Sequence, residues 1–344
     1  MSILVIGGGK MGMSHLALIS GYIGKDRVAL CEANWVTRLV FRYLGYRTFK
    51  SPNAAKVLLK HIDGVLIATP TRSHAEMVRW AISEKIPFFV EKPLTLDAAL
   101  SGALVTEAQH ANVPTQVGFV MRYVVTFRQL RSLVADRALG PVLSYSATMS
   151  GNVATKPFSK DDWRGNFAQG GGCLNEYGPH IIDLCRFIFG PVNGIGEASY
   201  EQVYSSAADD IIAATLKHAN KVEGRIRADW ANPSMRKSLI EFRVNFEHAQ
   251  VRVDNSAIDI TWAASAPLSV EEKNKQESTP VPPNVGFYLR GEEFSLEVED
   301  FLSTCLDNDF HADPSYRGNS APSLTDGCEV DILIEAIAKK AQLK

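Results

Sequence analysis

One stretch of the sequence places a histidine between two carboxylates at a spacing that could move a proton. Glu176, His180 and Asp183 stand at positions i, i+4 and i+7, so a single helix would present all three on one face. Histidine titrates near neutral pH, and a carboxylate one turn away can orient its ring and stabilise its charged form. We therefore expect His180 and Glu176 to act as an acid–base pair, and the alternative is a histidine that only packs or caps. Asp183 fits a structural or substrate-contacting role better than a role in proton transfer.

A glycine-rich run near the start of the chain has the spacing of a dinucleotide-binding turn. Gly7, Gly9 and Gly12 satisfy the pattern Gly-x-Gly-x-x-Gly, with Lys10 and Met11 between the last two glycines. In such a turn the first glycine permits a tight bend and the second lets the backbone approach a pyrophosphate. The third lets the helix pack closely on the strand, and the helix N-terminus faces the anion. A glycine-rich turn that binds nothing is the alternative.

Glu32 bears on the choice of dinucleotide. It follows the second expected strand, 20 residues after Gly12, where a carboxylate would bind the ribose hydroxyls of NAD. Its charge would repel a 2′-phosphate, which favours NAD over NADP. Arg38, one turn into the next expected helix, could still contact a phosphate, so NADP stays open. A solvated carboxylate at a strand end is the alternative for Glu32.

The elements that must position these residues alternate regularly over the first third of the chain. Short Val-, Ile- and Leu-rich runs are typical of strands that are buried on both faces, and helical patterns separate them. This alternation predicts a doubly wound parallel sheet in a domain of residues 1–118. The expected strands are 3–6, 27–31, 46–49, 64–68, 87–91 and 113–118. The expected helices are 11–22, 35–44, a short one from 52, 73–84 and 96–111.

The pattern changes after Gly118 and predicts a second domain of residues 119–344. Helical patterns cover 124–137, 173–189, 291–306 and 323–342, with a strand at 142–149. Between residues 194 and 262, successive segments rich in β-branched and aromatic residues predict one antiparallel sheet. We expect an α+β domain with a large, mostly antiparallel open sheet, and an exposed loop over 265–283.

Three further stretches, taken with the glycine-rich turn, resemble one family. They are Ala68-Thr69-Pro70-Thr71-Arg72-Ser73-His74, Glu91-Lys92-Pro93 and the run Gly170-Gly171-Gly172-Cys173-Leu174-Asn175-Glu176-Tyr177-Gly178-Pro179-His180-Ile181-Ile182-Asp183. In this order they are similar to the glucose–fructose oxidoreductase/inositol dehydrogenase (Gfo/Idh/MocA) family. The resemblance implies a Rossmann domain followed by a domain whose open sheet often forms a subunit interface. It also implies NAD(P)-dependent oxidation or reduction of a sugar, cyclitol or related polyol.

Several polar residues end expected strands of the parallel sheet. Ligands bind beyond the carboxyl ends of such strands, and Thr69, Pro70, Glu91 and Lys92 all lie there. The resemblance suggests a cis bond before Pro93, which would aim Lys92 at the nicotinamide and the substrate, whereas an ordinary surface lysine is the alternative.

His74 follows the Thr69-Pro70 turn, and we expect it to bond the loop beside the nicotinamide rather than to catalyse.

The chain departs from the family pattern at two positions. Glu176 stands where the family usually has aspartate, so it could support His180 instead of contacting substrate. After the sixth expected strand the family often has Gly-Phe-Asn-x-Arg-Phe, and this chain has Gly118-Phe119-Val120-Met121-Arg122-Tyr123. Arg122 is therefore kept, and Val120 replaces the family's asparagine. The resemblance assigns Arg122, Trp163 and Arg164 to the cofactor or the substrate rim, and Tyr177 to the substrate pocket.

Together these features predict hydride transfer between nicotinamide and a secondary alcohol or ketone of a sugar, nucleotide sugar or cyclitol. His180, held by Glu176, would move the hydroxyl proton, and Lys92 would stabilise the developing alkoxide. The reverse assignment, with Lys92 as the proton carrier, stays open.

Two other functions on the same scaffold also stay open. One is a non-catalytic NAD(H)-binding regulator. The other is an enzyme that uses transient oxidation for elimination or glycoside cleavage.

Composition excludes several other classes of protein. The chain has 344 residues and a formal net charge of -2, which leaves no strong field for nucleic acid or an anionic membrane surface. No run reaches the roughly 18 apolar residues of a membrane span, and the first residues show no leader pattern, so we expect a cytoplasmic protein. Five cysteines without a Cys-x-x-Cys pair, and no His-Glu-x-x-His, predict no metal site. The resemblance implies a homodimer or homotetramer through the open sheet.

Overall fold

The computed structural model describes residues 2–59, 61–137, 139–159, 162–263, 291, 293–306 and 321–343. The chain folds into two compact units. The first comprises Met1–Tyr123 and Ser278–Glu329, and the second comprises Val124–Glu277 and Val330–Lys344. The loop expected over 265–283 lies outside the described residues.

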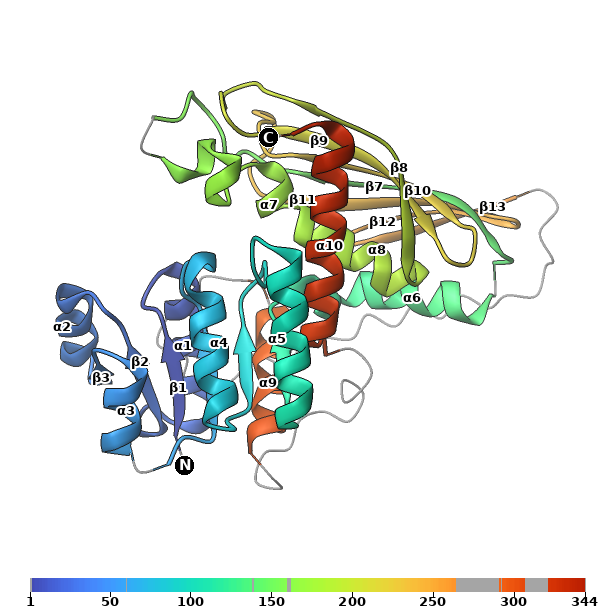
Figure 1. Cartoon of the computed structure of the whole chain (residues 1–344). Coiled ribbons are helices and arrows are strands. Elements are labelled where there is room, and N and C mark those ends of the chain that lie inside the picture. The colour runs from blue at the N-terminus through green and yellow to red at the C-terminus, as the bar shows by residue number, and fades with distance from the viewer. Residues whose placement is uncertain are drawn as a thin grey trace. The chain divides into compact units, whose positions relative to one another are not determined.

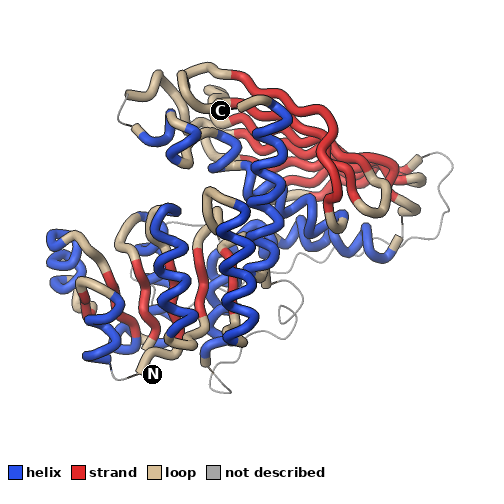
Figure 2. Tube along the Cα trace, viewed as in Figure 1, coloured by secondary structure: helices blue, strands red, loops and turns tan. Residues whose placement is uncertain are grey.

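The first unit is built on a parallel sheet of six strands among its described residues, in the order β3-β2-β1-β4-β5-β6 (Figure 1). The strands are β1 (Ile3–Ile6), β2 (Val28–Cys31), β3 (Arg47–Phe49), β4 (Gly64–Ile67), β5 (Phe88–Val90) and β6 (Thr115–Val117). Every residue of β1, β2, β4 and β5 is buried, because helices line both faces of the sheet (Figure 2). The predicted doubly wound parallel sheet is confirmed, and its strand order reverses between β1 and β4.

Some helices of this unit begin at residues whose side chains satisfy free backbone amides. Its helices are α1 (Lys10–Ile23), α2 (Trp35–Tyr43), α3 (Pro52–Leu59), α4 (His74–Ser83) and α5 (Ala98–Ala111). Asn34 caps α2 by accepting from the amides of Val36 and Thr37, and Asp97 caps α5 by accepting from the Leu100 amide. Asn112 ends α5 in the left-handed conformation that asparagine tolerates well.

Helix α9 (Glu293–Cys305) also belongs to the first unit, although it comes late in the chain. Its apolar face packs into the core formed by β1, β2 and α1 through Phe294, Val298, Phe301 and Leu302. The expected second domain covers residues 119–344 and so includes this helix, whereas the structure places the helix in the first unit. A helix can join a distant sheet whenever its apolar stripe completes that core.

The second unit contains a sheet of seven strands among its described residues, in the order β13-β12-β11-β7-β10-β9-β8. The strands are β7 (Val142–Ser150), β8 (Val192–Glu201), β9 (Ile211–His218), β10 (Glu223–Asp229), β11 (Leu239–Phe246), β12 (Ala249–Asp254) and β13 (Ile258–Trp262). The expected large and mostly antiparallel sheet is confirmed. The sheet is mixed, because β7 lies between β11 and β10 and runs parallel to β10.

One face of this sheet packs on helices and the other carries polar side chains. The helices of the unit are α6 (Val125–Asp136), α7 (Cys173–Glu176), α8 (Gly178–Phe189) and the later part of α10 (Leu324–Ala341). Phe127 of α6 meets Phe242 of β11 edge to face, and Phe189 of α8 stacks on Tyr145 of β7 with ring centroids 3.9 Å apart. Along β10 and β11, buried and more exposed residues alternate, which is the period of a sheet covered on one side.

Candidate functional site

The glycine-rich turn connects β1 to α1 and needs its glycines for close contacts. Gly7 has φ +103°, and a Cβ there would lie 2.6 Å from the Ala68 carbonyl oxygen at the end of β4. A Cβ on Gly12 would lie 1.9 Å from the Gly7 carbonyl oxygen, so only glycine lets α1 pack on the turn. Helix α1 begins at Lys10 with Gly9 as its N-cap, where a Cβ would meet nothing within 4 Å. This turn therefore has the shape that admits a pyrophosphate at a helix N-terminus.

Glu32 lies directly beside that turn. Its carboxylate accepts hydrogen bonds from the backbone amides of Gly8 (2.6 Å) and Asn34 (2.7 Å), which orient it at the end of β2. The Arg38 guanidinium bonds the carbonyl oxygens of Glu32 and Ala33, each at 2.6 Å. An oriented carboxylate at this point fits the ribose hydroxyls of NAD.

Lys10 and Met11 differ in their surroundings at the start of α1. The Lys10 side chain is exposed at the N-terminus of the helix. Met11 is partly buried and packs against the core of the first unit. Their assignment to cofactor binding stays a prediction.

The Glu91-Lys92-Pro93 turn follows β5 at the same edge of the sheet as the glycine-rich turn. The peptide bond before Pro93 is cis, as the resemblance implied. The Glu91 amide donates to the Ile67 carbonyl, which ties the turn to the end of β4. The Glu91 side chain is buried, and its carboxylate lies 2.8 Å from Nε2 of His15.

His74 joins two of the strand-end turns. Its Nε2 lies 2.9 Å from the Thr69 carbonyl oxygen, and its Nδ1 lies 3.0 Å from the Pro93 carbonyl oxygen and 3.2 Å from that of Leu94. Burial lowers the pKa of His74 against the opposing effect of these bonds. The ring therefore holds the Thr69-Pro70 turn to the segment after Lys92. The buried Thr69 hydroxyl oxygen makes no hydrogen bond among the described residues.

Arg122 lies in a short 3-10 helix, η3 (Val120–Tyr123), which ends the segment Met1–Tyr123 of the first unit. Its side chain is buried and pairs with Asp326 at 3.0 Å. Burial acts to raise the pKa of Asp326, but the charge and hydrogen bond of Arg122 hold it below its usual value. Val120 packs in the apolar core, which gives a physical reason for a valine in place of the family's amide. A ligand contact by Arg122 stays a prediction.

The predicted helix over 173–189 is wrong in one respect, because it forms two helices. The short α7 ends at Glu176, and α8 begins at Gly178, with Tyr177 between them. Pro179 in the first turn of α8 has no amide to continue the α7 ladder, which explains the break. Glu176 and His180 therefore lie on consecutive helices rather than on one face of a single helix, and both are half-buried.

The other residues assigned to the second unit have varied surroundings. Tyr177 is buried, and its hydroxyl lies 2.6 Å from the Ser238 hydroxyl. Asp183 is also buried. Trp163 and Arg164 are exposed on a short 3-10 helix, with the guanidinium carbon 4.9 Å from the indole centroid. Their roles stay predictions.

Two buried polar residues that the sequence interpretation did not select lie beside the selected ones. His15 binds Glu91, and the Asp209 carboxylate accepts from the Leu174 amide at the start of α7. The sequence did indicate His15, because it is a histidine within the apolar pattern of α1. No local signal marks Asp209, because its partner is 35 residues earlier.

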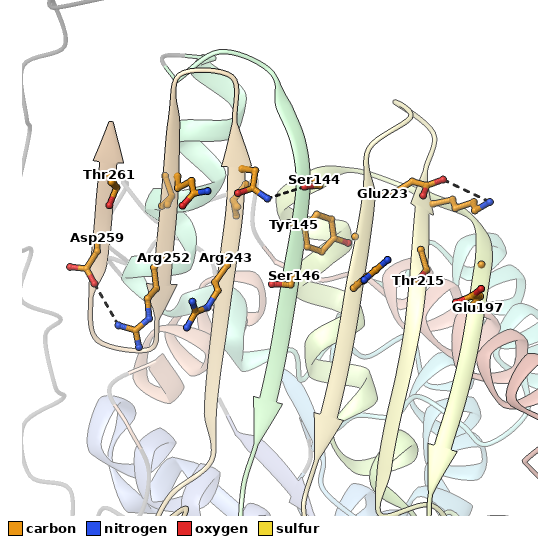
Figure 3. A pocket seen from close by; sticks show the side chains of 18 of the residues that line it. Ser144, Tyr145, Ser146, Glu197, Thr215, Glu223, Arg243, Arg252, Asp259 and Thr261 are labelled. Atoms are coloured by element: carbon orange, nitrogen blue, oxygen red, sulfur yellow. Dashed lines mark hydrogen bonds and ion pairs between the residues drawn. The ribbon is translucent and has the colours of Figure 1, made fainter. Parts of the chain in front are cut away.

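The polar face of the second unit's sheet forms a broad hollow of about 1120 Å³. Figure 3 shows Arg243, Arg252 and Asp259 on neighbouring strands, with an ion pair between the last two at 3.8 Å. On the other side of the hollow, Lys217 and Glu223 pair at 3.8 Å. Both signs of charge are therefore mixed across this face.

Comparison with known proteins identifies two family regions. Residues 1–119 match the oxidoreductase family with an NAD-binding Rossmann fold, and residues 127–252 match the GFO/IDH/MocA C-terminal domain. D-apiose dehydrogenase of Paraburkholderia graminis is 24% identical over 281 residues, which cover 81% of this chain and 72% of that protein. Inositol 2-dehydrogenase of Rhizobium meliloti is 24% identical over 349 residues, covering 98% and 97%.

A solved structure has the same fold. Levoglucosan dehydrogenase in complex with NADH and L-sorbose aligns with a TM-score of 0.79 at 20% identity, over 99% of this chain and 96% of that one. Among the described residues, no helix has the length and apolar character needed to cross a membrane. With its glycine-rich turn, its Glu91-Lys92-Pro93 turn and both family regions, the chain belongs to the Gfo/Idh/MocA family and is an NAD-dependent oxidoreductase.

Proposed function

We propose that this enzyme transfers a hydride between NAD and a secondary alcohol, or the matching ketone, of a sugar, nucleotide sugar or cyclitol. The observation that carries the proposal is the position of Lys92, in a turn anchored at the same sheet edge as the glycine-rich turn. Relatives named as apiose, inositol and levoglucosan dehydrogenases support the sugar-like class of substrate.

The first unit supplies most of the residues that would hold NAD, and the second unit contributes Trp163 and Arg164. The nicotinamide of NAD would accept the hydride during oxidation. The backbone at Gly7, Gly9 and Gly12 would receive the pyrophosphate at the N-terminus of α1, and Glu32 would bind ribose hydroxyls. The surrounding residues that the resemblance adds are Lys10, Met11, Thr69, Pro70, His74, Glu91, Arg122, Trp163 and Arg164.

The chemistry that remains for the chain concerns one substrate oxygen. The Lys92 ammonium donates a hydrogen bond to that oxygen and stabilises alkoxide charge as it develops. His180, supported by Glu176, takes the hydroxyl proton during oxidation and returns it during reduction. The assignment with Lys92 as proton carrier and His180 as the orienting group differs only in which nitrogen moves the proton. Tyr177, Asp183 and Arg122 complete the proposed substrate contacts.

Turnover of a sugar panel tests the proposal. Reduced nicotinamide is followed by absorbance with NAD and free sugars, cyclitols or nucleotide sugars. We expect one group of substrates to give net reduction, and Lys92→Met and His180→Ala to lower kcat by about a hundredfold or more. Lys85→Met, an exposed lysine in the turn before β5, is the control that should retain the parent rate.

The other outcomes contradict the proposal in distinct ways. NADH binding with no product from any sugar would favour the regulatory function. Product without a net change in nicotinamide would favour transient oxidation followed by elimination or glycoside cleavage. Full activity of Lys92→Met would exclude the assigned role of the ammonium, and a parent pH–rate profile in His180→Ala would exclude that of the imidazole.

A further inference from the structure

A wholly buried histidine on α1 contacts the residue that precedes Lys92. The His15 side chain has no exposed surface, and its Nε2 lies 2.8 Å from Oε1 of Glu91. Its ring lies beside that of Phe89 of β5, at a centroid distance of 5.2 Å, and that of Phe294 of α9, at 6.2 Å. These two rings and complete burial leave the imidazole little freedom to turn away from the carboxylate.

The second oxygen of Glu91 reaches the Lys92 backbone. Oε2 accepts from the Lys92 amide at 3.3 Å, so one carboxylate links α1 to the residue that carries the ammonium. Gly118 provides the space for this arrangement. A Cβ on Gly118 would lie 3.0 Å from Oε2, closer than a side chain tolerates without a shift.

The charges around Glu91 keep it ionised. Burial alone would raise the pKa of this carboxyl, but the hydrogen bond and charge of His15, with the charges of Lys92 and His74, lower it. Glu297 of α9 faces the same cluster, and burial and the Glu91 charge raise its pKa well above the usual value. Neither Glu297 carboxyl oxygen has a hydrogen-bond partner among the described residues, and the charges of Glu293 and Asp300 also disfavour its ionised form. The hydrogen bond and charge of His15 therefore favour the ionised form of Glu91, whereas burial and nearby negative charges disfavour that of Glu297.

We propose that His15 is a positioning residue for the reaction, which acts by holding the Glu91 carboxylate against the Lys92 backbone. The proposal rests on the role assigned to Lys92. His74 holds the same turn from its other side through the Pro93 and Leu94 carbonyls, so two buried histidines bracket the lysine. His15 also stands three residues after Gly12, so the helix that begins at the dinucleotide turn sets the direction of the lysine turn.

The first test needs no substrate. Amide hydrogen exchange over residues 88–96 is measured in the full-length protein for the parent, His15→Leu and His15→Gln. Leucine keeps the volume but has no donor, whereas the Gln amide can donate from near the position of Nε2. We expect faster exchange in His15→Leu, from the loss of the hydrogen bond at the Lys92 amide, and parent-like exchange in His15→Gln.

The second test uses the sugar that turns over in the panel, and NADH as the dinucleotide probe. We expect His15→Leu to lower kcat by about tenfold while the Kd for NADH stays within about twofold, because a small misplacement of a reacting group lowers rate more than binding. His15→Gln should retain most of the rate. Glu297→Gln keeps the shape of the neutral carboxyl and is the control, which should match the parent.

A pH series separates positioning from general damage to the fold. Without His15, Glu91 loses the hydrogen bond and charge that lower its pKa, so burial raises that pKa. The kcat of His15→Leu should therefore increase, relative to the parent, as rising pH ionises this carboxyl, and His15→Leu/Glu91→Gln should lose that increase. If His15→Leu folds poorly, Gly118→Ala provides a second route to displacing the carboxylate, with the same expected loss of kcat.

The results that would overturn this inference differ from those that would overturn the proposed function. A His15→Leu variant with the parent exchange, kcat and pH profile overturns the positioning role, even if Lys92→Met is inactive. Equal losses in His15→Leu and His15→Gln overturn it as well, since the donor would then be irrelevant. Full activity of Lys92→Met instead removes the proposed function itself.

Discussion

At the scale of single residues, Asp209 and Asp210 show how two neighbouring carboxyls acquire opposite properties. Burial raises the pKa of Asp209 from 3.8 to about 7, only partly offset by the bond from the Leu174 amide. Burial acts on Asp210 in the same direction, but bonds from Ser205 and Trp230 hold its pKa below the usual value. Asp210 also accepts from the amides of residues 203 and 204. The pKa of Asp209 is the higher of the two because Asp209 is more deeply enclosed and accepts from fewer donors.

Asp209→Asn should change the pH dependence of stability. Because the folded pKa is raised, the unfolded state loses its proton first, and the folded state loses about 1.4 kcal/mol of stability per pH unit between about pH 4 and 7. The asparagine oxygen can still accept from the Leu174 amide. We therefore expect the stability of the variant, relative to that of the parent, to increase as pH rises from 5 to 7 and to stay constant above that range. Urea unfolding at pH 5, 6, 7 and 8 measures this difference.

Asp210→Asn is the matched control with the opposite sign. A depressed folded pKa contributes stability that is present above the unfolded value and is lost as pH falls through the folded value. This variant should be less stable than the parent at pH 7. If Asp209→Asn instead follows the parent at every pH, then Asp209 is not the group that titrates near neutrality.

At the scale of elements, the glycines in the turn from β1 into α1 serve different purposes, one in folding and one in cofactor binding. Gly12 is required for packing, because its Cβ would collide with the Gly7 carbonyl oxygen. Gly9 has φ -72° and open space around it, so an alanine fits the fold there. The same open space is where the pyrophosphate would approach the backbone.

Gly9→Ala should therefore retain the parent's thermal midpoint and bind NADH at least about tenfold more weakly, as expected when a methyl group blocks close backbone approach. Gly12→Ala should lower the thermal midpoint as well as the affinity. Fluorescence titration with NADH and thermal unfolding measure the two effects. Parent affinity in Gly9→Ala would mean that the dinucleotide does not lie against this turn.

At the scale of the whole molecule, the polar face of the second unit's sheet is the surface we propose for a second copy. The face mixes basic and acidic side chains, including Arg225, Lys217, Glu223 and Asp259, so it can complement itself across a two-fold axis. The family resemblance that implied a homodimer or homotetramer pointed to the same sheet.

Arg225→Glu should weaken that assembly, because an acidic side chain would replace a basic one that can pair with acidic groups of the other copy. Light scattering after gel filtration at micromolar concentration should give a multiple of 37.8 kDa for the parent and a shift toward 37.8 kDa for the variant. Lys50→Glu, on the first unit, is the control. A parent that elutes as a single chain would contradict the proposal.

Much of the first unit could be predicted because its signals are local. The apolar runs of β1, β2 and β4 and the glycine spacing act within a few residues. Pro179 also indicated the break between α7 and α8. The periodic spacing of Glu176 and His180 nevertheless favoured a single helix. Periodicity describes which residues share a face only if the helix is continuous.

The amino-acid sequence by itself determined the parallel sheet, the dinucleotide turn and the residues able to do chemistry, because each depends on neighbours along the chain. Only the tertiary structure decided that α9 completes the core of the first unit, that β7 pairs in parallel with β10, and that His15 binds Glu91. The last contact joins residues 76 positions apart, and the first two depend on which surfaces remain to be covered. Side-chain types limit such pairings, but close packing in three dimensions selects among them.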